Sequence, residues 1–187
     1  MASILLTGFE PFGGAASNSS WEAVQRVAGI DGLVTAVLPV EFGRASEVLA
    51  GLIAEHEPDV VIAVGLADGR VHITPERVAI NLEDARIPDN AGAQPRELPV
   101  VENGPDAYFT GLPVTAIVDA LREQGIPAQA SLSAGAFVCN SLMYRLMHSV
   151  PAGVTAGFIH VPSERDMDVN TIARGLEVAV RVVTGGA

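Results

Sequence analysis

The stretch "DVVIAVG" at residues 59–65 constrains the fold of this chain more than any other. It is a continuous run of β-branched and other apolar residues, which is typical of a strand covered on both faces. Shorter apolar runs of the same kind alternate along the chain with segments of helical spacing. We therefore predict an α/β fold with an open twisted, mostly parallel sheet and helices on both faces, an α/β/α sandwich.

The expected elements follow this alternation. Strands are expected at 3–9, 33–40, 59–65, 77–82, 127–132 and 153–161. Helices are expected at about 19–29, 43–56, 113–124, 140–150 and 168–183. The segment 84–113 holds five prolines, so we expect it to leave the core and to cover a site or make subunit contacts.

The length of 187 residues, without internal repeats or linkers, predicts one domain spanning 1–187. No apolar run approaches the roughly 20 residues that cross a bilayer, and the N-terminus lacks a basic region and cleavage site for export. The single cysteine fits a reducing compartment. We therefore expect a cytoplasmic protein that does not bind membranes.

The charge balance excludes several classes of function. The formal net charge is −11, and all eleven basic residues are arginines scattered along the chain, which argues against nucleic-acid binding. The absence of lysine excludes Schiff-base chemistry and a P-loop. No metal-binding motif is present, so neither a metal nor a cofactor is expected.

The single cysteine, Cys139, lies where "SLSAGAF" gives way to a predicted helix. A helix N-terminus presents unpaired N–H groups and a positive dipole end, and both lower the pKa of a thiol. This position makes Cys139 a candidate nucleophile. The alternative is a core cysteine, because Cys139, Met143, Leu146 and Val150 follow helical spacing and could form one buried stripe.

A thiol nucleophile requires a base, and His160 is the best candidate. It ends the apolar run "VTAGFIH" at the carboxyl end of a predicted strand, where open α/β sheets place their sites. Glu76 could accept the second ring N–H of His160 and fix its tautomer. The alternative for Glu76 is a structural ion pair with its neighbour Arg77.

The glycine-rich turn "TGFEPFGGAASNSSW" follows a strand and precedes a helix, as a phosphate-binding loop would. It lacks G-x-G-x-x-G spacing, however, and Glu10 would repel an anion. The turn instead carries Phe9 and Phe12. These rings form either a hydrophobic plug under the sheet or an aromatic pocket for a flat, neutral ligand.

Five segments in order resemble the type I pyroglutamyl peptidases, also called pyrrolidone-carboxylate peptidases, over effectively the whole chain. They are "TGFEPFGG", "GLADGR" with "ERVAIN", "DARIPDN", "AGAFVCN" and "FIHVP". The resemblance implies an open α/β/α fold and a homotetramer. It also implies a cysteine peptidase that removes an N-terminal 5-oxoproline, or pyroglutamyl, residue from peptides through a thioester.

The resemblance also implies roles for individual residues. Cys139 matches the nucleophile, His160 the base and Glu76 the residue that orients the base, while Arg86 matches a position that assists the oxyanion or shapes the site. The lactam ring would lie among residues matching Phe9, Phe12 and Phe137, with backbone groups near Leu66 and Val138. The chain departs from many relatives at Leu66 and Asp68, where they carry glutamine and glycine, so a side-chain hydrogen bond to the substrate is lost.

Two other classes of function are compatible with the same layout. One is a non-catalytic module that keeps the pocket and binds lactam-like or peptide ligands. The other is a nucleoside phosphorylase-like enzyme, which would require a phosphate site.

Overall fold

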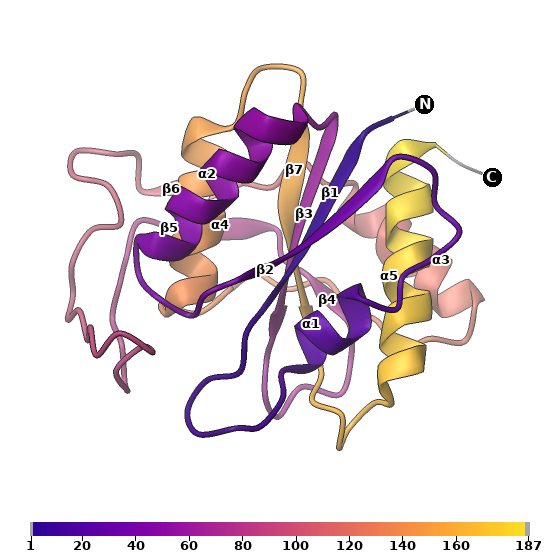
Figure 1. The fold of residues 1–187 in the computed structure, drawn as a ribbon, viewed down its shortest axis with the longest axis horizontal. Helices are drawn as coiled ribbons and strands as arrows, with labels where there is room; N and C mark the ends of the chain where they lie inside the picture. Colours follow the sequence, from indigo (N-terminus) through magenta and orange to yellow (C-terminus); the bar gives the residue numbers. More distant parts are fainter. Residues whose placement is uncertain (1, 186–187) are drawn as a thin grey trace.

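The computed structural model describes residues 2–185 and contains a five-stranded central sheet of order β2-β1-β3-β7-β4 (Figure 1). The strands are β1 (Ile4–Phe9), β2 (Leu33–Leu38), β3 (Val60–Leu66), β4 (Thr74–Pro75) and β7 (Thr155–Val161). β2, β1, β3 and β7 are parallel, and only β4 runs antiparallel to its neighbour β7. The prediction of an open, mostly parallel sheet is confirmed.

Five helices cover the two faces of this sheet. They are α1 (Ser19–Val24), α2 (Arg44–His56), α3 (Val114–Glu123), α4 (Val138–Ser149) and α5 (Val169–Thr184). α1, α3 and α5 lie on one side of the sheet, and α2 and α4 lie on the other (Figure 1). None of the helices within residues 2–185 is long and apolar enough to cross a membrane.

The central strand β3 supplies both halves of the core. Val60, Ile62 and Val64 join the cluster under α1, α3 and α5, whereas Val61 and Ala63 join the cluster under α2 and α4. All five side chains are buried. The unbroken apolar run therefore exists because successive side chains of a strand point to opposite faces, and both faces are covered here.

Three expected elements differ from the structure. The helix expected at 19–29 ends at Val24, where the next turn tightens through bonds from Arg26 N to Ala23 O and from Val27 N to Val24 O. The segment 127–132 is not a regular strand, since only Ala128 and Ser131 make isolated bridges. The strand expected at 77–82 lies outside the central sheet.

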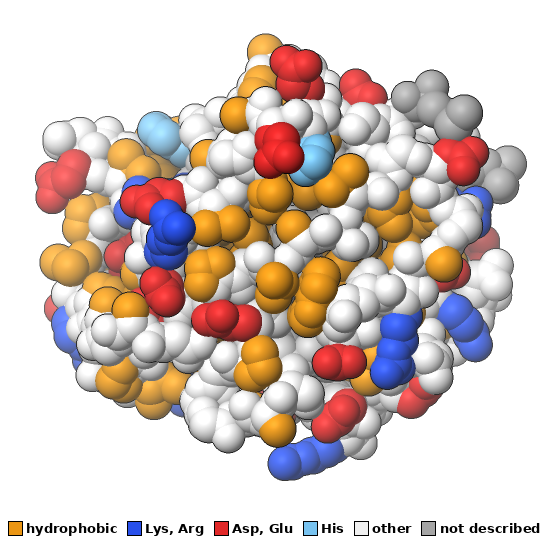
Figure 2. All heavy atoms as spheres, in the orientation of Figure 1, with side chains coloured by type: hydrophobic (Ala, Val, Ile, Leu, Met, Phe, Trp, Pro, Cys, Tyr) orange, Lys and Arg blue, Asp and Glu red, His pale blue; other side chains and the backbone are white. Residues whose placement is uncertain are grey.

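That strand is β5 (Val78–Ile80), which pairs antiparallel with β6 (Ala107–Phe109) in a separate two-stranded sheet. The segment 84–113 thus leaves the core after β5 and returns through β6. Asn140 of α4 fastens this unit to the helix. Its Oδ1 accepts from the N–H of Ile80 at 3.0 Å, and its Nδ2 donates to the carbonyls of Ile80 and Leu82. Side chains of both charges are interspersed on the molecular face drawn in Figure 2.

The close approach of α1 to β1 depends on Gly8, and this generates a stability prediction. We expect Gly8→Ala to lower the free energy of unfolding by about 1–3 kcal/mol, because backbone must move to admit a methyl group. Its Cβ would lie 2.7 Å from the backbone N and Cα of Trp21. Urea unfolding monitored by circular dichroism measures the change.

Gly51→Ala is the matched control, since Gly51 lies within α2 and a Cβ there meets nothing within 4 Å. This change should raise the free energy of unfolding by about 0.5–1 kcal/mol through helix propensity. Equal effects of the two substitutions would contradict the packing described for Gly8.

Candidate active site

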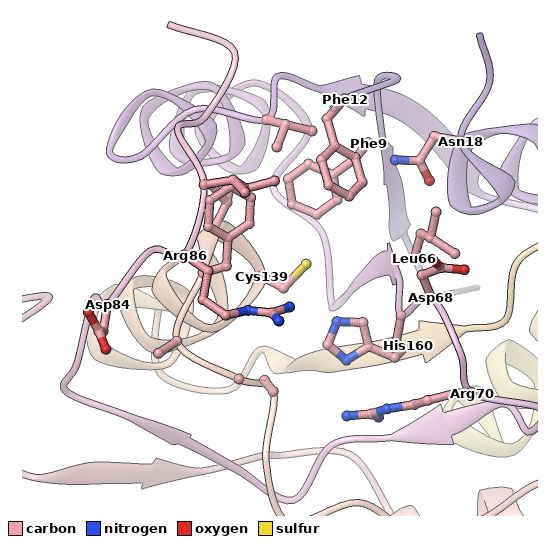
Figure 3. A pocket seen from close by; sticks show the side chains of 18 residues that line it. Phe9, Phe12, Asn18, Leu66, Asp68, Arg70, Asp84, Arg86, Cys139 and His160 are labelled. Carbon is pink, nitrogen blue, oxygen red and sulfur yellow. The ribbon is translucent and has the colours of Figure 1, made fainter. Parts of the chain in front are cut away.

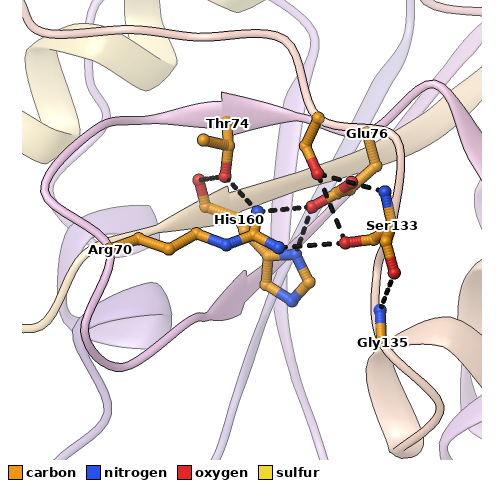
Figure 4. Close-up of polar contacts among 7 residues, drawn as sticks. Arg70, Thr74, Glu76, Ser133, Gly135 and His160 are labelled. Atoms are coloured by element: carbon orange, nitrogen blue, oxygen red, sulfur yellow. Dashed lines mark hydrogen bonds and ion pairs between the residues drawn. The ribbon is translucent and has the colours of Figure 1, made fainter.

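The carboxyl ends of β1, β3 and β7 meet at one edge of the sheet and open into a cavity of about 510 Å³ (Figure 3). Turns after β1 and β3, the start of α4 and residues 84–87 complete its walls. Eight of the nine sequence-predicted site residues line it: Phe9, Phe12, Leu66, Arg86, Phe137, Val138, Cys139 and His160. The ninth, Glu76, is not part of the lining. It lies next to His160, as Figure 4 shows.

The short strand β4 brings Glu76 to His160 across 84 residues of sequence. Its antiparallel register places Thr74 opposite His160, and the N–H of Glu76 then bonds the carbonyl of Phe158 at 3.0 Å. As a result, Nδ1 of His160 lies 2.7 Å from Oε1 of Glu76. Glu76 is 0% exposed and His160 is 4% exposed, so water does not compete for this contact.

The charge states of this pair follow from its surroundings. Burial lowers the pKa of His160, and the Glu76 carboxylate offsets only part of that effect. Burial raises the pKa of Glu76, but hydrogen bonds and charge from His160, Ser131 and Arg70 hold it below the ordinary value. An ionised Glu76 accepts a hydrogen bond from the Nδ1–H of a neutral His160. The unprotonated ring nitrogen is then Nε2, the atom that a general base needs.

Arg70 is a residue of the candidate site that sequence reasoning missed. Its guanidinium donates to Oε1 of Glu76 at 2.7 Å, to Oγ1 of Thr74 at 2.6 Å and to the carbonyl of Ser133 at 2.9 Å (Figure 4). Arg77, the ion-pair partner considered from sequence, donates instead to Thr115. The only signal was that Arg70 ends the motif "GLADGR".

Cys139 is the second residue of α4, as the predicted position at a helix start requires. The capping residue Phe137 makes no side-chain hydrogen bond to the helix, so no side chain caps the N–H groups of the first turn, whose residues Val138 and Cys139 line the cavity. The sulfur packs over Gly65, where a Cβ would lie 2.9 Å from Sγ. Cys139 is half-buried and packs against the hydrophobic cluster that includes Met143 and Leu146, so features of both sequence interpretations are present.

The backbone N–H at the start of α4 lowers the pKa of the Cys139 thiol, as expected, but burial outweighs this effect. Burial raises the pKa of Cys139 to about 12, the Glu76 carboxylate adds to the rise, and Arg70 and the residue's own backbone N–H counteract it only in part. Within residues 2–185 no hydrogen bond joins the thiol of Cys139 to the ring of His160. Both shifts favour a neutral thiol and a neutral imidazole at rest.

Aromatic rings form the opposite wall of the cavity. The centroids of Phe12 and Phe137 are 6.3 Å apart, and Phe42 packs edge-on against Phe137 at 5.2 Å. Glu10 points away from this space, since its carboxylate accepts from the N–H of Val40 and the amide of Asn90. The wall is thus apolar and fits the pocket interpretation of the glycine-rich turn.

Charged groups lie around the rest of the cavity. Arg86 extends toward Cys139 in Figure 3, and Asp84, Asp68 and Arg70 also line the space. The backbone N–H of Asp84 bonds the carbonyl of Ala136 at 2.9 Å, which fastens the start of the segment 84–113 to the loop before α4. Asp84, Arg86 and Ile87 of this segment line the cavity, and whether the segment covers a site or makes subunit contacts stays a prediction. Residues 2–185 contain no cluster of three metal-ligating side chains.

Comparison with known proteins places this geometry in a family. The family model for pyroglutamyl peptidase matches residues 2–185. The pyrrolidone-carboxylate peptidase of Klebsiella pneumoniae is 50% identical over 97% of this chain and 92% of the relative. That of Bacillus licheniformis is 47% identical over 94% of this chain and 89% of the relative.

Solved structures agree with the sequence matches. Pyroglutamyl peptidase I of Bacillus amyloliquefaciens superimposes with a TM-score of 0.95 at 42% identity, covering 99% of this chain and 98% of that one. A mutant pyrrolidone carboxyl peptidase of Pyrococcus furiosus gives a TM-score of 0.92 at 38% identity, with 98% of each chain covered. By fold and by sequence, this chain belongs to the pyroglutamyl peptidase family.

Proposed function

We propose that this chain hydrolyses the N-terminal pyroglutamyl residue from peptides, with Cys139 as nucleophile, His160 as general base and Glu76 as the residue that orients the base. The observation that carries the proposal is one cavity lined by Cys139, by His160 and by an aromatic wall. Glu76 does not line this cavity but is hydrogen-bonded to His160. The names of the relatives support the same reaction.

The cavity suits the chemistry of a pyroglutamyl group. Such a residue has no free amine, so its pocket needs no carboxylate to hold a cation. It requires apolar walls for a flat ring and a few hydrogen bonds for the lactam. Phe9, Phe12 and Phe137 supply the walls. Backbone groups at Leu66 and Val138 supply the polar contacts, since the Leu66 side chain forms no hydrogen bonds.

The reaction begins when Nε2 of His160 takes the thiol proton while Sγ of Cys139 attacks the pyroglutamyl carbonyl. The oxyanion that forms is stabilised by the N–H of Cys139 at the start of α4 and by the Arg86 guanidinium. The imidazolium then donates its proton to the departing amine, and the C–N bond breaks to leave a thioester. Water, deprotonated by His160, attacks the thioester and releases pyroglutamate and the thiol. Glu76 stabilises the transient imidazolium.

The first prediction concerns the nucleophile. Wild-type protein should release aminomethylcoumarin from L-pyroglutamyl-aminomethylcoumarin, and prolonged iodoacetamide treatment should stop the release. Cys139→Ala should be inactive, and Cys139→Ser should lose at least about 10³-fold in kcat with its fold intact, because a hydroxyl is far less ionised than a thiol. Fluorescence gives the rate, and circular dichroism checks the fold.

The alternative of a non-catalytic binding module predicts a different result. Folded wild-type protein would then release no coumarin, while calorimetry would detect binding of a pyroglutamyl peptide in wild type and Cys139→Ala alike. An active Cys139→Ser variant at the wild-type rate would refute the assignment of the nucleophile.

The second prediction ranks the two partners of the thiol. His160→Gln should lose roughly ten- to a hundred-fold more activity than Glu76→Gln. The reason is that His160 transfers the proton, whereas Glu76 only orients the imidazole ring and stabilises the imidazolium. Steady-state kcat values of the two purified variants test the order. Equal losses, or a larger loss for Glu76→Gln, would contradict these roles.

The third prediction follows from the raised pKa of Cys139. Because that pKa is about 12, the thiolate fraction should grow steadily with pH across the neutral and weakly alkaline range. The iodoacetamide alkylation rate of this single cysteine should therefore rise about tenfold per pH unit between about pH 7 and pH 9. A plateau near neutral pH would instead indicate a resting thiolate–imidazolium pair.

A further inference from the structure

Arg70 holds together three segments that surround the catalytic carboxylate. It follows β3, and its half-buried guanidinium donates to Thr74 in β4, to Glu76 just after β4, and to the carbonyl of Ser133 in the loop before α4. All three donor–acceptor distances lie between 2.6 and 2.9 Å. A planar guanidinium presents five donors in a fixed fork, a spread of directions that the three donors of a compact ammonium do not reproduce.

The contact with Glu76 bears directly on the proposed chemistry. Oε1 of Glu76 accepts from Nη1 of Arg70 at 2.7 Å and from Nδ1 of His160 at 2.7 Å, so both donors converge on one oxygen. The rotation of the carboxylate about its side chain is therefore set by both partners together. If Arg70 were absent, His160 would be the single side chain holding that oxygen in place.

We propose that Arg70 is a positioning residue, whose guanidinium holds the Glu76 carboxylate in the orientation that receives the Nδ1–H of His160. The proposal rests on the function proposed above. It assigns Arg70 a role through Glu76, with no contact to the substrate's reacting atoms.

The charge of Arg70 also affects the other groups of the site. It lowers the pKa of both His160 and Cys139, although burial is the largest influence on each. The other charged or titratable groups lining the two cavities that Arg70 borders are Asp68, Asp84, Arg86 and His72. Removing the guanidinium should therefore raise the pKa of the Cys139 thiol and slow its alkylation at neutral pH.

A second cavity makes the proposal testable by chemical rescue. Arg70 lines both the catalytic cavity and a separate cavity of about 540 Å³, whose other walls include His72, Thr74 and residues 129–133. Truncating the arginine side chain would leave its guanidinium site reachable from this second cavity. A small planar cation could then enter and bond the same acceptors.

The experiment compares Arg70→Ala with Arg77→Ala, whose side chain donates to Thr115 and not to Glu76. Arg70→Ala should lose about 10- to 100-fold in kcat, with little change in KM. A loss of this size in kcat corresponds to the free energy of one charge-assisted hydrogen bond. Millimolar guanidinium should restore part of the activity, whereas urea, of the same shape but uncharged, should not. Arg77→Ala should behave like wild type.

Two further measurements separate positioning from a purely structural role. Iodoacetamide should alkylate Cys139 more slowly in Arg70→Ala than in wild type at the same pH, and Arg70→Lys should restore the wild-type alkylation profile by keeping the charge. The alkylation readout does not require turnover, so it tests Arg70 even if the wild-type chain fails to hydrolyse pyroglutamyl substrates, a result that would refute the proposed function alone.

Several outcomes would overturn the proposal. They are kinetics of Arg70→Ala that match Arg77→Ala, a loss confined to KM, and rescue by urea as effective as rescue by guanidinium. If Arg70→Ala does not fold, Arg70→Lys carries the test, with a lowered kcat expected from its fewer simultaneous hydrogen bonds. A Lys variant with the full wild-type kcat would then contradict a role for the guanidinium geometry.

Discussion

The buried carboxylate of Glu76 is the interaction on which the candidate site depends. A charge removed from water destabilises a fold unless partners replace the lost hydration, and here Oε1 receives two donors at 2.7 Å. The two donors are Arg70 and His160. They reach Oε1 because β4 lies antiparallel beside β7 and because the turn after β3, which carries Arg70, folds back over β4. The two-residue strand β4 thus places Oε1 of Glu76 within reach of both donors, whereas the buried Oε2 has no hydrogen-bond partner within residues 2–185.

The same carboxylate adds to the rise in the pKa of the Cys139 thiol. The start of α4 favours a thiolate on Cys139, but burial and the negative charge of Glu76 oppose it more strongly. In the proposed mechanism, the N–H groups at the start of α4, which no side chain caps, act on charge that develops later, on the carbonyl oxygen of a substrate. Donors that strengthen only in the transition state lower the barrier, whereas donors satisfied at rest do not.

The spacing of apolar residues along the sequence predicted the central sheet, the helices on its two faces and the position of Cys139 at the start of a helix. The pKa of that thiol could not be predicted in the same way, since burial depends on how distant segments pack. Arg70 was missed for a related reason. Neighbours along extended backbone point to opposite sides, so Arg77 turns toward Thr115 while Glu76 turns inward, and the partner comes from six residues earlier.

Asp89 and Glu10, two acidic side chains apart from Glu76, hold the walls of the cavity. Asp89 accepts from the N–H groups of Phe42, Ala91 and Ala93, and Glu10 accepts from Val40 and Asn90. These bonds join the turn after β1, the turn after β2 and the segment 84–113. They also point the two carboxylates at backbone and amide donors, away from the aromatic rings. An acidic chain can therefore build a pocket with an apolar wall, because these carboxylates are occupied in fixing the loops that carry the phenylalanines.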